Sequence, residues 1–454
     1  MNKRASRLGE RAIVLGGGIA GTLVARVLAD HFEHVTVLER DGAPDADGFR
    51  KGTPQAKLVH GLLRGGLDAI NSIFPELEQA LYDRGAVRAK PARDMLLVDG
   101  SGAWPFADVG LEIPFVSRPA LEQSLRAALA RVQNVALSER TTVRGLIGDG
   151  EHIRGVVCRS EDGATRQELA GLVVDASGRA AHTGEWLAKL GLSAPPQTSV
   201  DVDIAYAGCF VRPRRTSSVL GALVTEPPPA GRYGCLMQAQ EGDRWIVGFA
   251  ARGRDASLPA DFASLLAGAE RLPHPGAFEL LRDAEPLSEV ARFGFPTSIH
   301  RHYERMERLP DGFLCIGDAI CSFNPIWGQG MSVAALEVVA LSRLLRDCAS
   351  DGAELTGLAR AFYGEAARII APAWQLSVIP DFGFHTTRGP RPPGVDTGRG
   401  FMRALARLGQ REPAVRALLN DVYHLVRPLE ALRAPELVAQ VLALMEAPSS
   451  APQA

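Results

Sequence analysis

A glycine-rich segment near the N-terminus has the spacing of a phosphate-binding turn. Residues 16–21 have the sequence GGGIAG; they follow an apolar run over 12–15 and open a helical pattern over 20–29. Gly16 permits a tight turn, Gly18 lets a pyrophosphate approach the backbone, and Gly21 allows close packing of helix on strand. Phosphates bound there face unpaired N–H groups and the positive end of the helix dipole. The segment therefore predicts a dinucleotide site.

A carboxylate stands where such a site needs one. Glu39 ends the second apolar run, 35–38, about 20 residues after the glycines, where it can accept hydrogen bonds from ribose hydroxyls. Arg40 is a further candidate contact with the cofactor, with a solvated surface arginine as the alternative. This motif alone does not separate FAD from NAD.

A second glycine motif far downstream favours FAD. Residues 317–331, GDAICSFNPIWGQGM, follow an apolar run over 313–316 and open a helical pattern over 331–345. Asp318 can hydrogen-bond the ribityl hydroxyls of FAD. Gly328 and Gly330 leave backbone N–H groups at a helix start facing an acceptor on the flavin ring, where the dipole stabilises negative charge.

The pair of motifs resembles the aromatic-hydroxylase-like, class A flavoprotein monooxygenases. The resemblance implies that Asp318 contacts the ribityl chain and that the loop between Pro325 and Gly330 lies against the isoalloxazine. It also implies that Arg118, in SRPALEQSL, lies near the FAD phosphates. The residues to which these roles are carried are Arg118, Asp318, Pro325, Gly328, Gly330 and Met331.

Two further segments refine the resemblance. Residues 173–179, VVDASGR, are similar to the middle motif of the class, but they have Asp-Ala-Ser-Gly in place of Asp-Gly, which puts a contact with NAD(P)H in doubt. Residues 50–55, RKGTPQ, with Lys51 as a candidate cofactor contact and His60 after them, look most like the bacterial flavin epoxidases of polyether pathways. Flavin halogenases fit less well, because no Trp-x-Trp-x-Ile-Pro segment occurs.

The resemblance implies a reaction class. NAD(P)H as a transient co-substrate, or a separate flavin reductase, reduces FAD; O2 then forms a C4a-hydroperoxide, which transfers one oxygen atom to an apolar organic substrate. Epoxidation of an alkene or hydroxylation in polyketide or terpenoid biosynthesis is the leading interpretation. An FAD-dependent reductase or dehydrogenase of an isoprenoid or polyketide double bond is the alternative, and a scaffold that has lost catalysis is a third.

No side-chain nucleophile is needed for this chemistry, and none is evident. No Gly-x-Ser-x-Gly or His-Glu-x-x-His segment occurs. His60 is the catalytic candidate, with a surface or helix-start histidine as the alternative. His300 and His302 alternate like a metal pair, but with no third ligand in reach we interpret them as polar residues of a strand or loop and predict no metal site.

The elements that position these motifs predict an α/β fold. The first motif lies in a strand–helix–strand unit with the parallel crossover of a Rossmann-like FAD-binding domain. Runs 202–206, 235–238 and 245–249 alternate as half-buried strands do, with a hairpin turn at 241–244. We therefore expect an inserted, mostly antiparallel sheet that binds substrate, followed by a C-terminal helical region.

The changes of sequence pattern along the chain predict the following domain boundaries. The discontinuous FAD-binding domain is predicted over 1–88, 116–198 and 286–350, and the substrate-binding sheet domain over 89–115 and 199–285. A helical region follows over 351–446, with a disordered tail over 447–454.

The substrate pocket is expected between the flavin loop and the inner face of the inserted sheet. Aromatic and apolar side chains there suit an apolar molecule better than a charged metabolite. The candidate lining residues are Tyr206, Phe210, Met237, Trp245, Phe249, Phe293 and Phe295.

Composition excludes other classes of function. The chain has 454 residues with a formal net charge of −2, which argues against a nucleic-acid or anionic-membrane partner. The longest apolar helical pattern, 331–345, is shorter than the roughly 20 residues of a membrane span. Six scattered cysteines without a Cys-x-x-Cys pair suit reduced thiols, so we expect a cytoplasmic protein.

Overall fold

The computed structural model describes residues 7–214, 217–350, 352 and 355–446. Its first layer is a parallel sheet with the strand order β18-β11-β1-β2-β7. The strands are β1 (Gly9–Leu15), β2 (Phe32–Leu38), β7 (Val135–Ser138), β11 (Leu172–Asp175) and β18 (Phe313–Cys315). Together with the second sheet and the C-terminal helices, this arrangement confirms the predicted α/β class.

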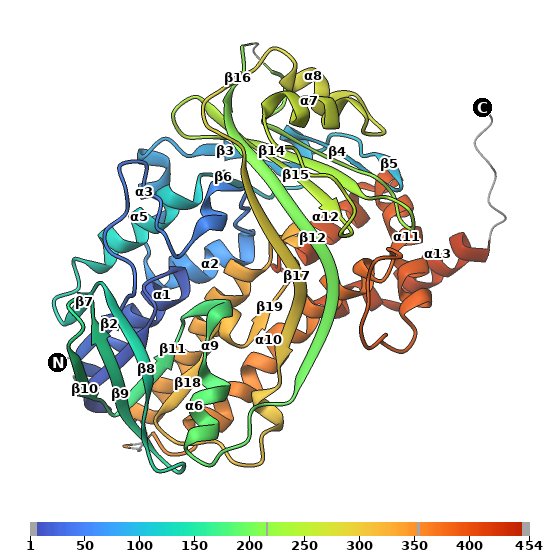
Figure 1. Cartoon of the computed structure of the whole chain (residues 1–454). Coiled ribbons are helices and arrows are strands. Elements are labelled where there is room, and N and C mark those ends of the chain that lie inside the picture. The colour runs from blue at the N-terminus through green and yellow to red at the C-terminus, as the bar shows by residue number, and fades with distance from the viewer. Residues whose placement is uncertain (1–6, 215–216, 351, 353–354, 447–454) are drawn as a thin grey trace, which may run out of the picture.

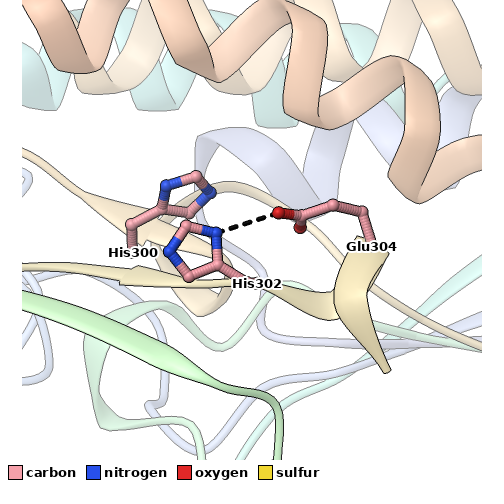
Figure 2. A group of neighbouring side chains, drawn as sticks. All are labelled: His300, His302 and Glu304. Atoms are coloured by element: carbon pink, nitrogen blue, oxygen red, sulfur yellow. Dashed lines mark hydrogen bonds and ion pairs between the residues drawn. The ribbon is translucent and has the colours of Figure 1, made fainter. Parts of the chain in front are cut away.

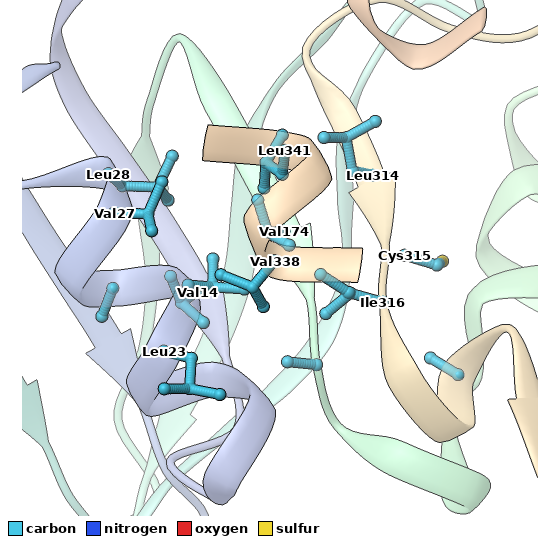
Figure 3. Close-up of a cluster of buried hydrophobic side chains, with 14 of the residues drawn as sticks. Val14, Leu23, Val27, Leu28, Val174, Leu314, Cys315, Ile316, Val338 and Leu341 are labelled. Atoms are coloured by element: carbon cyan, nitrogen blue, oxygen red, sulfur yellow. The ribbon is translucent and has the colours of Figure 1, made fainter. Parts of the chain in front are cut away.

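Two helices from distant parts of the sequence share one core against this sheet. Helix α1 (Ile19–Leu28) connects β1 to β2, and α9 (Gly330–Ser350) follows β18 after a loop. Figure 3 shows Leu23 of α1 and Val338 of α9 on either side of Val14 of β1. All three side chains are fully buried. Burial of these aliphatic surfaces fixes the two helix starts relative to each other.

The second layer is a larger, mostly antiparallel sheet with the order β19-β17-β12-β15-β14-β13-β4-β5. The long strands β12 and β17 run side by side through the middle of the molecule (Figure 1). A register shift interrupts their pairing between Asp201 and Ile204, where Asp203 has a φ of 46°. The strands are β4 (Met95–Asp99), β5 (Gly102–Ala103), β12 (Gln197–Arg212), β13 (Gly221–Thr225), β14 (Tyr233–Gln240), β15 (Arg244–Arg252), β16 (Glu285–Pro286), which pairs with β12, β17 (Ala291–Arg301) and β19 (Cys321–Ser322).

The predicted domain boundaries cross this sheet. Strand β4 joins it from the segment 89–115 by parallel pairing with β13, and β12 to β15 come from 199–285. Strand β17, which the boundary at residue 286 assigns to the FAD-binding part, pairs with β12 along most of its length. After β17 the chain returns to the parallel sheet at β18, and β19, which lies within the second glycine motif, then pairs with β17.

Two smaller antiparallel sheets, of three strands and two strands, and the remaining helices complete this part of the fold. Helices α7 (Phe262–Glu270) and α8 (Gly276–Leu281) lie over one face of the larger sheet and share a buried cluster with β13, β14 and β15. The elements are α2 (Arg64–Ile73), α3 (Leu77–Asp83), β3 (Val87–Ala89), α4 (Pro91–Asp94), β6 (Ile113–Phe115), α5 (Arg118–Leu129), β8 (Thr141–Gly148), β9 (Ile153–Ser160), β10 (Thr165–Leu169), α6 (Thr183–Lys189), α7 (Phe262–Glu270) and α8 (Gly276–Leu281), with the short 3-10 helices η1 (Pro54–Lys57), η2 (Gly178–Ala180), η3 (Tyr303–Arg305), η4 (Gly317–Ala319) and η5 (Pro325–Trp327).

Helices fill the C-terminal part, as the sequence predicts. They are α10 (Leu358–Asp381), α11 (Val395–Arg411), α12 (Pro413–Tyr423), η6 (Leu429–Arg433) and α13 (Pro435–Glu446). Helix α10 packs along α9 and ends beside the larger sheet. The tail predicted over 447–454 lies outside the described residues. Within the described ranges, none of the helices has the length and apolarity needed to span a bilayer.

Candidate active site

A single cavity of about 770 Å³ joins the two glycine motifs. Gly18 at the start of α1 and Gly330 at the start of α9 both line it, although 312 residues separate them in the sequence. The cavity also reaches the inner face of the larger sheet. Of the candidate cofactor contacts, the following line it: Gly16, Gly18, Glu39, Arg40, Lys51, Arg118, Asp318, Pro325, Gly328, Gly330 and Met331.

The first turn needs its glycines for two different reasons. A Cβ atom added to Gly21 would lie 1.8 Å from the carbonyl oxygen of Gly16, so Gly21 lets α1 pack on the turn without itself lining the cavity. Gly16 has a φ of 96°, which side chains rarely adopt. A Cβ added to Gly18 would meet only the guanidinium of Arg50, at 4.0 Å, and would otherwise occupy the cavity.

A buried arginine supports the carboxylate at the end of β2. Glu39 accepts a hydrogen bond from the backbone N–H of Gly17 at 2.7 Å and from Arg50 at 3.0 Å. Arg50 also pairs with Glu122 of α5 at 2.7 Å. Burial alone lowers the pKa of Arg50, but the carboxylates of Glu122 and Glu39 outweigh it and raise that pKa. Sequence reasoning singled out Lys51 and missed Arg50, because the pairing with Glu122 spans 72 residues.

His60 orients Arg118 and has no free nitrogen. Its Nδ1–H donates to the carbonyl of Leu58 at 2.9 Å, and its Nε2 accepts from Arg118 at 3.2 Å. Burial and the charge of Arg118 lower the pKa of His60 to about 3, so the ring is neutral near pH 7. Arg118 also pairs with Glu122 at 2.9 Å. The geometry favours a positioning role for His60 over the catalytic role predicted from the sequence.

Behind the second motif lies a buried acid, Glu337, with which no cation of the described residues forms an ion pair. Burial raises the pKa of Glu337 on α9 to about 8, against an ordinary value of 4.5. Its Oε2 accepts the backbone N–H of Gly317 at 2.7 Å, and its Oε1 has no hydrogen-bond partner within the described part of the chain. Glu337 therefore holds the turn that presents Asp318. Burial also raises the pKa of Asp318, against the opposing charges of Arg179, Arg118 and Arg301.

We expect Glu337→Gln to stabilise the protein as pH rises. The folded pKa lies above the unfolded one, so ionisation costs the fold about 1.4 kcal/mol per pH unit between pH ~4.5 and ~8. The glutamine oxygen still accepts from Gly317, and the amide does not ionise. Urea unfolding should show a variant more stable by about 3–5 kcal/mol above pH ~8, with the difference vanishing towards pH ~4.5. A constant difference, or the same trend in the exposed control Glu270→Gln, would contradict this.

The loop before α9 carries a buried amide with unused donors and acceptors. Gln329 is 1% exposed and lines the cavity, yet neither its Oε1 nor its Nε2 has a hydrogen-bond partner among the residues that the structure describes. Asn324 holds the loop by accepting the N–H of Ile326 at 3.2 Å, and Gly328 has a φ of 64°. Buried amides are ordinarily hydrogen-bonded, so an unpaired one facing a cavity indicates a polar ligand there.

Comparison with known proteins identifies the ligand. A family model described as an FAD binding domain matches residues 10–370 of the chain. The chain belongs to this FAD-binding family. Protein Rv3254 of Mycobacterium tuberculosis (strain ATCC 25618 / H37Rv) is 31% identical over 406 residues, which cover 86% of this chain and 84% of that protein.

Two further relatives extend the comparison. Kynurenine 3-monooxygenase of Salinispora tropica is 24% identical over 364 residues, which cover 76% of this chain and 74% of that enzyme. The structure of the flavin-dependent brominase Bmp2 superposes with a TM-score of 0.68 at 14% identity, covering 96% of this chain and 98% of that one. The structural match at this identity shows the fold shared with a flavoenzyme.

The residues present fit FAD. Glycines at positions 18, 328 and 330 leave space that a Cβ atom would take from the cavity, at both of its helix starts. Gln329 supplies unpaired donors and an acceptor at the α9 end. In this FAD-binding protein the first motif would hold the diphosphate and Glu39 the ribose. Asp318 and the loop from Pro325 to Met331 would hold the ribityl chain and the ring.

The substrate end of the cavity lies against the larger sheet. Of the seven candidate lining residues, Tyr206, Phe293 and Phe295 line the cavity. Met237, Phe249 and Trp245 belong to the cluster under α7 and α8 on the other face of the sheet. Phe210 is on the cavity side of β12 but outside the lining, where it contacts Phe49 and the guanidinium of Arg244.

Small residues and a distant tyrosine complete the wall in this FAD-binding protein. On β15, Gly248 and Ala250 face the cavity while Phe249 faces the opposite cluster. Tyr423 of α12 also lines the cavity, and its hydroxyl donates to the carbonyl of Trp327 at 3.2 Å. The sequence contained a signal for Gly248 and Ala250, since small residues alternate with large ones along a strand that faces a ligand. Nothing in the sequence pointed to Tyr423.

The expectation that His300 and His302 have no third ligand in reach was wrong. Because the chain turns into η3 directly after β17, potential ligand atoms of His300, His302 and Glu304 all lie within 4.8 Å of one another (Figure 2). However, Nδ1 of His302 lies 2.9 Å from Glu304, and Nε2 lies 2.8 Å from the hydroxyl of Thr198. Both nitrogens are therefore in use, and the ring of His300 packs at 4.0 Å on that of His302.

We keep the prediction that this group holds no metal ion. A transition metal would have to displace a hydrogen bond of His302, either to Glu304 or to Thr198, before it could use all three residues as ligands. Adding zinc to the protein should therefore leave its melting temperature unchanged, and His302→Asn should respond to zinc in the same way. A zinc-dependent rise in melting temperature that His300→Ala removes would contradict this prediction.

Proposed function

We propose that this flavoprotein is an FAD-dependent monooxygenase that transfers one oxygen atom from O2 to a largely apolar organic substrate. The observation that carries the proposal is the continuity of one cavity from Gly18, past Gly330, to the aromatic wall formed by Tyr206 and Phe293. The similarity to kynurenine 3-monooxygenase supports this class of reaction. The resemblance of residues 50–60 and 323–331 to polyether-pathway epoxidases favours an alkene as the group that is oxidised.

The overall reaction balances with a nicotinamide donor. NAD(P)H gives up two electrons and one proton as a hydride and leaves as NAD(P)+, and one further proton from solvent is used to form water. One oxygen atom of O2 enters the substrate, and the other leaves as water. Bound FAD supplies the redox chemistry that activates O2, and the protein contributes binding, orientation and exclusion of water. A separate flavin reductase is the alternative source of electrons.

The residues have distinct parts in this proposal. The helix start at Gly18 and the cation Arg118 would bind the diphosphate, and His60 holds Arg118 in place. The start of α9 would direct backbone N–H groups and its dipole at the ring, where they would stabilise negative charge. The sheet wall excludes water from the reacting face. Its small residues Gly248 and Ala250 leave room for the substrate.

Isotope labelling tests the oxygenase proposal directly. The FAD-loaded protein should oxidise NAD(P)H under air in the presence of terpenoid or polyketide alkenes and form epoxides or alcohols. Under 18O2 one labelled oxygen atom should appear in each product molecule, and under H2(18)O none. A reaction that proceeds without O2 and saturates the double bond would establish the competing reductase function. A protein that neither oxidises NAD(P)H nor accepts electrons from a reductase would be a scaffold.

A further inference from the structure

The middle motif places an arginine at the flavin end of the cavity. Asp175 is fully buried at the end of β11; it accepts the N–H of Ser177 at 2.9 Å and the hydroxyl of Thr183. Gly178 follows with a φ of 79°, and Arg179 comes next on the single turn η2. Arg179 lines the cavity between Asp318 and the sheet wall. The turn is therefore built to present this side chain.

The charge of Arg179 is not paired with any carboxylate of the described residues. Across the described ranges, no ion pair within 4.0 Å includes Arg179, whereas the neighbouring Arg50 and Arg118 both pair with Glu122. The charge of Arg179 acts to lower the pKa of the nearby Asp318, although the two side chains do not form an ion pair within 4.0 Å in the described part of the chain. A cation that lines a half-enclosed cavity without a counter-ion is expected to attract an anionic ligand.

Aromatic rings fix the guanidinium and leave its hydrogen-bond donors free. The guanidinium carbon lies 4.8 Å from the ring centre of Phe293 and 5.3 Å from that of Phe295. Cation–π contact holds the group over the ring faces, so the N–H donors at its edge remain available. Both phenylalanines come from β17, on the wall that we propose for the substrate. The charge thus sits at the edge of an apolar surface.

We propose that Arg179 binds a carboxylate of the organic substrate, so that the substrate is an amphipathic acid. Its apolar part lies along Tyr206, Leu236 and Phe293, and its carboxylate pairs with the planar guanidinium. This inference rests on the proposed function and narrows its substrate class. A phosphate of NAD(P)H has related chemistry, but one arginine flanked by aromatic rings suits a planar carboxylate on an apolar body better than a phosphate. Phosphate sites commonly add backbone N–H groups at a helix start.

Binding to the oxidised holoenzyme tests the proposal without turnover. The probes are para-vinylbenzoate and linoleate, each compared with its methyl ester, and binding is followed through the perturbation of the flavin spectrum. The wild type should bind each acid about 10-fold or more tightly than its ester. Arg179→Gln should weaken acid binding by about 10- to 100-fold and leave ester binding nearly unchanged. Arg179→Lys keeps the charge but loses the planar pair of N–H donors, so its affinity for the acids should lie between those of the wild type and Arg179→Gln.

Matched controls exclude other roles. Arg254→Gln removes an arginine that is 91% exposed and outside the cavity, so it should keep the preference for acids. FAD affinity is measured for every variant, because loss of FAD in both Arg179→Gln and Arg179→Lys would make Arg179 a cofactor residue and overturn the proposal. Equal binding of acid and ester by the wild type, or a preference that survives in Arg179→Gln, would also overturn it.

The nicotinamide is tested in a separate arm. Anaerobic flavin reduction is followed at increasing NADH and NADPH concentrations in the wild type and in Arg179→Gln. We expect an unchanged concentration dependence; a defect confined to NADPH or NADH would assign the anion to the donor and overturn the proposal. Because the spectral titrations need no O2, a protein that binds acids through Arg179 but forms no oxygenated product would contradict the monooxygenase function alone.

Discussion

Replacing Gly18 by valine is expected to give a folded but colourless protein. The added Cβ atom meets no backbone, since its nearest neighbour is the flexible end of Arg50 at 4.0 Å. The two methyl groups instead enter the cavity at the helix start, where the diphosphate of FAD must approach bare N–H groups. We expect FAD affinity to fall by about 100-fold or more, because charged hydrogen bonds worth about 1.5–3 kcal/mol each are lost or stretched.

The measurement combines the visible flavin spectrum of the purified protein, FAD titration and far-UV circular dichroism. Gly364→Val is the matched control, because Gly364 lies on α10 with nothing within 4 Å of an added Cβ and outside the cavity. Gly21→Ala should behave differently again, since its Cβ would overlap the Gly16 carbonyl and disturb folding itself. A yellow Gly18→Val protein with normal FAD affinity would refute the assignment of the first helix start to the diphosphate.

The parts of the site that sequence predicted are those whose geometry the backbone alone imposes. Gly16, Gly21 and Gly328 occupy positions where a side chain would be strained or would clash, and such positions leave a readable pattern of glycines. The carboxylates Glu39 and Asp318 follow buried strands of the parallel sheet, so their place at its carboxyl edge follows from the strand pattern.

The parts that sequence could not supply depend on which elements meet. Alternation along β14 and β15 predicts two faces for each strand, but it does not say which face meets the cavity and which meets α7 and α8. Met237 and Phe249 were therefore proposed for the pocket although they pack in the opposite cluster. Likewise, Glu304 approaches His300 only because the chain turns into η3 after β17.

The buried polar network around the flavin loop is the clearest example of such a tertiary feature. Asn324 donates to the carboxylate of Asp381 at 2.9 Å and 3.1 Å, and it accepts the hydroxyl of Tyr206 at 2.9 Å. Asp381, the last residue of α10, also pairs with Arg252 of β15 at 3.1 Å. The network thus joins the loop, the larger sheet and the C-terminal helices behind the flavin site.

Replacing Asp381 by alanine is expected to destabilise the protein strongly. The side chains of Asp381 and Arg252 are 0% and 5% exposed, so removing the carboxylate leaves an unpaired guanidinium where water cannot reach it. Breaking a buried pair in this way costs about 3–5 kcal/mol. The amide of Asn324 loses its acceptor at the same time, so we also expect the loop to loosen and FAD to be retained less well.

Urea unfolding and the fraction of bound FAD measure the two effects, and a rescue separates charge from packing. Asp381→Leu combined with Arg252→Met replaces the ion pair by apolar groups and should recover part of the stability that either single change loses, because no charge is then left buried without a partner. The control is Asp255→Ala, which breaks an ion pair with Arg232. The side chains of Asp255 and Arg232 are 72% and 44% exposed, so this change should cost less than about 1 kcal/mol of stability.

If Asp381→Ala cost no more stability than Asp255→Ala, the network would not be what holds the flavin loop against α10. The loop would then have to be held by its own turn at Asn324 and Gly328 and by the packing of α9 on the core.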